Sequence, residues 1–213
     1  CGLFNSGPEI RYRITVEVNT PEGVRSGTGV WSLKLRPGNF DQAYNARIRG
    51  EAIPVDLPGG RTIFALLEVP VKLPEDVVAR RYFPEARNPT GIGPSRPKQI
   101  AYIRRHIRNK IELDCRSRRQ ESECPILVAF KSPMNPTSVY ELNPDDLPNS
   151  LGRGFSLRGV YLQVTDDAPT NQLENRLPWL DRTQGKTLDG STVSDYSTLA
   201  NTLTFYSFKR WDK

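Results

Sequence analysis

Three cysteines carry the most evident chemistry in this 213-residue chain, and they stand at positions 1, 115 and 124. Cys115 and Cys124 enclose a short polar run, and no histidine or further cysteine completes a zinc-type spacing. The pair therefore favours a disulfide, which persists in oxidising compartments, over two free cytosolic thiols. Such a bond would close a loop of about ten residues and add about 2–3 kcal/mol of stability in the chain-entropy model.

Nucleophilic catalysis by a Ser-His-Asp or Cys-His group would have to use His106, the only histidine. Arginines surround this residue, and the chain has no Gly-x-Ser-x-Gly turn. A single histidine also supplies too few ligands for zinc and other soft metals. We predict no catalytic residue, no metal site and no cofactor.

Paired carboxylates leave acid–base chemistry open as an alternative. Asp145 and Asp146 lie in an Asn-Pro-Asp-Asp-Leu run, which is typical of a helix start at the Asn. Asp166 and Asp167 follow an expected strand, where either could act as a general acid or base. Adjacent strand residues point to opposite faces, so these two would not share one cleft by themselves.

The formal net charge is +6, from 30 basic and 24 acidic residues. The whole excess lies in residues 96–119, which we expect to form an anion-binding or partner-binding surface; the alternative is the solvated back of a helix. The candidate residues are Arg104, Arg105, Arg108, Lys110, Arg116, Arg118 and Arg119. Anionic lipid, lipopolysaccharide or acidic protein faces would be the partners. Nucleic acid is not expected, because no binding motif or interleaved aromatic residues accompany the charges.

Most elements that would position these residues are strands. Apolar and polar residues alternate over 10–18 and again around Trp31, where the glycines at 27 and 29 suggest a bulge. Residues 46–57 and 61–69 indicate a hairpin whose second strand is apolar on both faces and therefore covered on both. Further strands are expected at 126–130, 139–142, 155–164 and 202–208.

Isoleucines at 100, 103, 107 and 111 predict an amphipathic basic helix over 96–113, after a Pro-rich excursion at 70–97. A second, short helix is expected within 170–180. We therefore predict an α+β fold, mostly antiparallel β-sheet of about eight strands, with three or four short helices. The last strand would lie at a sheet edge and contact a partner. Its candidate residues are Phe205, Tyr206, Phe208 and Trp211.

A mature chain that begins with Cys resembles a bacterial lipoprotein. In that family the first cysteine carries diacylglycerol on its sulfur and an acyl group on its nitrogen. The resemblance implies lipidation of Cys1. Residues 1–9 would then form a flexible tether, and the chain length favours a single domain over 10–213. Lipidation of Cys1 also accounts for the odd number of cysteines, and Gly2 in place of Asp favours the outer membrane over the inner one.

Several segments together resemble a set of membrane-anchored envelope proteins of Gram-negative bacteria that have no assigned activity. The segments are residues 11–18, 20–27, 49–52, 55–57, 64–67, 143–147, 164–167 and 174–180. The resemblance implies a location on the periplasmic side of the cell envelope. Over residues 84–124 this chain is unlike the set, and any special function would lie there.

The expected function is that of a non-enzymatic envelope lipoprotein, an accessory or scaffolding subunit of a membrane-associated complex. Its partners would be the membrane, through the lipid on Cys1, and other envelope proteins. The alternative is a periplasmic enzyme or binding module that acts on anionic envelope polymers such as lipopolysaccharide or peptidoglycan.

Overall fold

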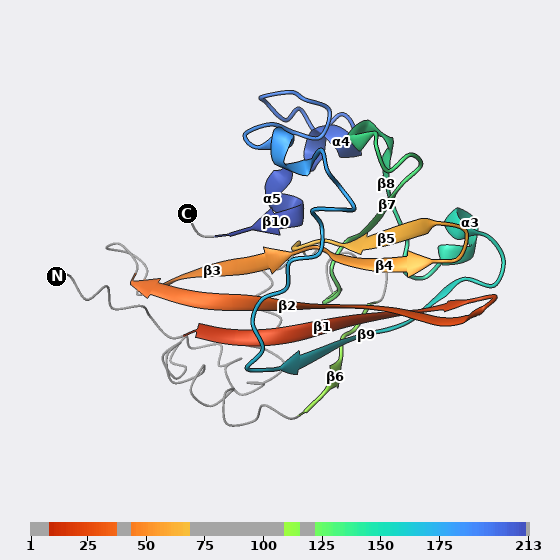
Figure 1. Cartoon of the computed structure of the whole chain (residues 1–213), viewed down its shortest axis with the longest axis horizontal. Coiled ribbons are helices and arrows are strands. Elements are labelled where there is room, and N and C mark those ends of the chain that lie inside the picture. The colour runs from red at the N-terminus through yellow and green to blue at the C-terminus, as the bar shows by residue number, and fades with distance from the viewer. Residues whose placement is uncertain (1–8, 38–43, 69–108, 116–121, 212–213) are drawn as a thin grey trace.

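The computed structural model describes residues 9–37, 44–68, 109–115 and 122–211, as Figure 1 shows. Within these ranges ten strands form two antiparallel sheets, accompanied by three short α-helices. The predicted α+β class with mostly antiparallel pairing is confirmed. The Pro-rich excursion at 70–97 and all of the tether except Glu9 lie outside the described residues. None of the described helices has the length and hydropathy that crossing a lipid bilayer requires.

One sheet has six strands in the order β10-β3-β2-β1-β9-β6. Its strands are β1 (Glu9–Thr20), β2 (Gly23–Pro37), β3 (Tyr44–Glu51), β6 (Ile111–Glu112), β9 (Ser156–Val164) and β10 (Lys209–Arg210). Along β1 half-buried and buried residues alternate strictly, as the sequence predicts. The buried side chains face the second sheet, and Tyr12 packs edge-on against Trp31 with the ring centroids 6.0 Å apart.

The second sheet has four strands in the order β4-β5-β7-β8. They are β4 (Ile53–Leu57), β5 (Arg61–Ala65), β7 (Leu127–Phe130) and β8 (Val139–Glu141). The expected strand over 46–57 is divided, because the chain leaves the first sheet after Glu51 and enters the second at Ile53. β5 is covered on both faces, as predicted: Ile63 packs between the sheets, and Phe64 packs on the opposite side.

A third layer, made by residues 173–208, covers the outer face of the four-stranded sheet (Figure 1). It contains α4 (Leu199–Thr202), α5 (Phe205–Phe208) and a 3-10 turn, Leu180–Thr183. The predicted strand over 202–208 is therefore wrong. Thr204 and Ser207 form a capping box, which starts a helix and places Phe205 and Phe208 on one buried face. The helix expected within 170–180 is also absent from these residues, which form turns ahead of the 3-10 turn.

Gly27 and Gly29 of β2 allow the two sheets to approach closely. A Cβ atom on Gly27 would lie 2.8 Å from Val55 and closer still to the Pro54 carbonyl oxygen of β4. The predicted bulge at these glycines is wrong, since the register between β1 and β2 runs unbroken. The irregularity lies instead on the other side of β1, between Glu17 and Val18 opposite β9.

Two helix predictions need correction. Residues 96–108 of the expected basic helix lie outside the described residues, but its last part forms β6, where Ile111 pairs with Leu162 of β9. The helix expected at Asn143 begins later, as α3 (Leu147–Leu151), with Asp146 as its N-cap. At β6 the neighbouring strand, rather than local propensity, decides which backbone groups pair. At α3 the cap is local, because Asn143 accepts from the Asp145 amide in a turn of its own.

Candidate functional site

Cys115 and Cys124 form the predicted disulfide, with their Cα atoms 5.0 Å apart. The flanking residues support the same closure: the Glu123 amide donates to the Asp114 carbonyl oxygen, 2.8 Å, and the Asp114 amide donates to the Glu123 carboxylate, 3.0 Å. Cys124 is buried ahead of β7, whereas Cys115 follows β6. The bond therefore joins the edge of the six-stranded sheet to the chain that enters the four-stranded sheet.

A pocket of about 550 Å³ opens beside this disulfide, between β6, β9 and the turn at Pro144. Its charged lining is formed by Glu112, Asp114, Asp145 and Arg158, and Cys115 contributes to one wall. Three acidic groups and one basic group thus line the pocket.

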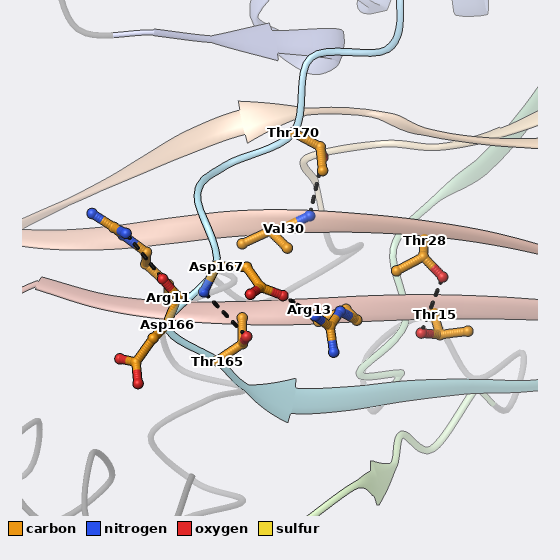
Figure 2. A network of polar contacts seen from close by, with 9 residues as sticks. All are labelled: Arg11, Arg13, Thr15, Thr28, Val30, Thr165, Asp166, Asp167 and Thr170. Carbon is orange, nitrogen blue, oxygen red and sulfur yellow. Dashed lines mark hydrogen bonds and ion pairs between the residues drawn. The ribbon is translucent and has the colours of Figure 1, made fainter. Parts of the chain in front are cut away.

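A segment that we call the strap, residues 165–173, crosses the outer face of the six-stranded sheet, as Figure 2 shows. Thr170 is hydrogen-bonded to Val30 of β2 twice: its amide donates to the Val30 carbonyl, 3.3 Å, and its hydroxyl accepts from the Val30 amide, 3.1 Å. The Gln172 side chain donates to the Thr28 carbonyl oxygen, 2.8 Å. The pairing of β2 with β3 begins at Ser32, so the strap bonds pair backbone groups of β2 that β3 does not reach.

Asp166 and Asp167, the candidate acid–base pair, both lie exposed on the strap. The Asp167 carboxylate forms an ion pair with Arg13 of β1, and the Arg11 guanidinium donates to the backbone oxygen of Asp166, 3.2 Å (Figure 2). The Asp167 amide donates to the Thr165 hydroxyl, 3.2 Å. Neither carboxylate lines the pocket beside the disulfide. In this arrangement the two aspartates hold the strap to the sheet.

Glu51, at the end of β3, is buried to 1% exposure and is the residue that sequence reasoning missed. Its carboxylate accepts from the Gln172 and Leu173 amides, 2.6 and 3.1 Å, and from the Trp211 indole, 3.4 Å. The Lys209 ammonium of β10 forms an ion pair with it at 3.4 Å. One carboxylate thus connects β3, the strap and the C-terminal strand. Its sequence neighbours gave no sign that this charge is buried.

The predicted anion-binding residues are described only in part. Lys110 forms an ion pair with Glu17 of β1, 3.6 Å, and lies over the Tyr161 ring, 4.0 Å from its centroid. The others, at positions 104, 105, 108, 116, 118 and 119, lie outside the described residues, as do Cys1 and His106.

The predicted partner-binding residues near the C-terminus do not share one surface. Phe205 and Phe208 are buried in the third layer, whereas Tyr206 is 55% exposed. Trp211 follows β10 and carries the Arg49 guanidinium over its ring, 5.0 Å from the centroid.

The third layer also holds a hydrogen-bonded loop, residues 187–201. Its centre is Asn201, buried to 3% exposure, whose side chain accepts from the Asp195 and Tyr196 amides and donates to Asp189, 2.9 Å. Hydrogen bonds from the Thr187 side chain, then from Ser191 and Asn201, hold the pKa of Asp189 far below its ordinary value. The Ser197 side chain and amide likewise lower the pKa of Asp195.

No group of three or more His, Cys, Asp or Glu side chains in the described ranges is arranged to hold a metal ion. Models of known protein families, curated proteins and solved structures were all compared with this chain, and none matches it.

Proposed function

We propose that this protein is a lipid-anchored accessory or scaffolding subunit on the periplasmic side of the bacterial cell envelope. The observation that carries the proposal is the Cys115–Cys124 disulfide, because such bonds persist in oxidising compartments and are rare in the cytosol. Lipid on Cys1 would hold the domain at a membrane without a spanning segment.

The placement of the acidic residues favours this role over the enzymatic alternative. Asp166 and Asp167 were the groups proposed to act on anionic envelope polymers, but both are exposed on the strap, and Asp167 is engaged by Arg13. A carboxylate already paired with an arginine at the surface is poorly suited to abstract or deliver a proton. The D166N/D167N variant should therefore retain whatever cellular activity the wild-type chain has.

The test is gentle detergent extraction of the native protein, followed by native and intact mass spectrometry. We expect a lipid mass on Cys1, a mass two hydrogens below the reduced chain for the disulfide, and a stoichiometric protein partner. Charge reversal at Arg104, Arg105 and Arg108 should release the partner, whereas reversal at the exposed Arg153 and Lys186 should not. An unlipidated chain that travels alone would contradict the proposal.

A further inference from the structure

One corner of the six-stranded sheet carries cations that its neighbours do not neutralise. The start of β1, the end of β2 and the start of β3 lie on the same side of the molecule (Figure 1). The register aligns Arg11, near the start of β1, with Ser32 of β2 and Arg49, near the end of β3, on the outer face that the strap partly covers. In the next row Lys34 lies between Glu9 and Arg47.

We call Arg11, Lys34, Arg49 and Trp211 the basic corner. Arg11 is paired with Glu9 at 3.3 Å, but within the described part of the chain Lys34 and Arg49 take part in no ion pair.

Arg49 and Trp211 form the second feature of this corner. The Arg49 guanidinium lies over the Trp211 ring, 5.0 Å from its centroid, and the residue remains exposed. Stacking orients a planar guanidinium while leaving its N–H groups available for phosphate oxygens. Trp211 is half-buried, and a tryptophan beside cations is the combination that membrane-interface residues provide.

We infer that the basic corner rests on a bilayer surface that contains anionic phospholipid. This inference rests on the proposed lipid anchor, because Cys1 stands only eight residues before Glu9. A chain of that length spans at most about 28 Å, at roughly 3.5 Å per residue. A lipid on Cys1 would therefore keep the start of β1, and the corner beside it, close to the headgroups. Each basic residue near such a surface adds to the attraction.

The test uses the full chain with Cys1→Ser, so that no lipid anchor contributes, and vesicles of phosphatidylcholine with or without phosphatidylglycerol. Trp211 is a local reporter, since Trp31 and Trp179 are buried to 1% and 8% exposure. We expect salt-sensitive binding only when phosphatidylglycerol is present. We also expect the Trp211 fluorescence to shift to the blue and to be quenched by lipids brominated on the acyl chain. Trp211→Phe should remove that signal.

The matched variants are K34E/R49E and R153E/K186E, which change the net charge equally. We expect the first to weaken binding about tenfold or more, and the second to weaken it far less because neither Arg153 nor Lys186 lies on β1, β2 or β3. Thermal melting shows that each variant folds, and K34Q/R49Q replaces the first if it does not.

Three results would overturn the inference: no binding to anionic vesicles, equal weakening by both double variants, or sedimentation with vesicles without a Trp211 signal. The last would assign binding to another face, such as residues 96–119. The mass of Cys1 in native protein is measured separately. An unmodified Cys1 would contradict the proposed anchor, whereas failed vesicle binding with a lipidated Cys1 would contradict the corner alone.

Discussion

At the scale of single residues, Glu51 has the largest structural consequence. Its carboxylate is buried at the point where β3 ends, and its partners come from positions 172, 173, 209 and 211. A charge removed from water is tolerated only where hydrogen bonds and an opposite charge compensate it, and Glu51 has both. The residue therefore fixes the strap and the C-terminal strand against the same edge of the sheet.

Replacing this carboxylate tests that role. Glu51→Gln would turn an amide NH₂ group toward donors and leave the Lys209 ammonium without its buried partner. We expect the free energy of unfolding to fall by about 3 kcal/mol, as measured by urea denaturation. Glu22→Gln is the matched control: Glu22 is exposed and pairs with the exposed Arg25, so the loss of unfolding free energy should stay below about 0.5 kcal/mol. Equal effects would show that burial of Glu51 contributes nothing.

Gly27 provides a second test at this scale. A methyl group there would press on Val55 and on the Pro54 backbone, which cannot move as a flexible side chain can. We expect Gly27→Ala to destabilise the protein by about 1–3 kcal/mol in the same denaturation experiment. Ser26→Ala, on the neighbouring exposed residue, should change stability by less than about 0.5 kcal/mol. A neutral Gly27→Ala would mean that the two sheets can separate at this point.

At the scale of elements, the strap and the 187–201 loop show how irregular segments are held. The strap satisfies the open edge of β2 through Thr170 and Gln172. The loop is organised by Asn201 from within, so Tyr196 is kept at a positive φ of 59°. Backbone in this region is strained for residues other than glycine and persists where surrounding bonds impose it. The strap has no helix or strand of its own, whereas the loop is organised by Asn201 from the first turn of α4.

The loop should respond to acid. Because hydrogen bonds lower the pKa of Asp189 in the folded state, its stabilising contribution is complete above the unfolded-state pKa of 3.8 and is lost as the pH falls below it. We expect the amide protons of residues 195 and 196 to exchange faster as the pH falls from about 5 to about 3, relative to intrinsic rates. Asp189→Asn should show fast relative exchange at both pH values. Unchanged protection in acid would contradict this account.

At the scale of the whole molecule, chain crossings and the disulfide connect the three layers. The chain passes between the sheets at Ala52, the strap leads from β9 to the third layer, and the disulfide links β6 to the approach to β7. The middle sheet is thereby buried on both faces, as the two apolar clusters on either side of β5 indicate.

Removing the disulfide tests its contribution to this assembly. We expect Cys115→Ser/Cys124→Ser to lose about 2–3 kcal/mol of unfolding free energy, because a closed ten-residue loop restricts the unfolded chain. The wild-type protein should lose a similar amount after reduction with dithiothreitol. Cys1→Ser should leave stability unchanged, since Cys1 takes no part in the Cys115–Cys124 bond. A double variant as stable as the wild type would show that the loop is already restricted without the bond.

Much of the strand arrangement could be predicted because periodicity reports which faces of a segment are apolar. The alternation from Ile10 to Val18 gave β1, and the run around Phe64 gave a strand covered on both sides. The disulfide followed from the spacing of Cys115 and Cys124 and their polar loop. These features depend on residues close together in the sequence, where side-chain order and backbone geometry are directly linked.

By itself, then, the sequence determined the fold class, the long strands and the cysteine pair. Tertiary structure alone decided that Ile111 pairs with β9 instead of extending a helix, and that Phe205 and Phe208 belong to a helix instead of an edge strand. It also decided that Glu51 is buried and that Lys34 and Arg49 share a corner. The physical reason is the same in each case, because the partners lie on other strands, on the strap or in the third layer. Local helix and strand propensities amount to a fraction of a kcal/mol per residue. The burial and hydrogen bonds that those distant partners supply outweigh them.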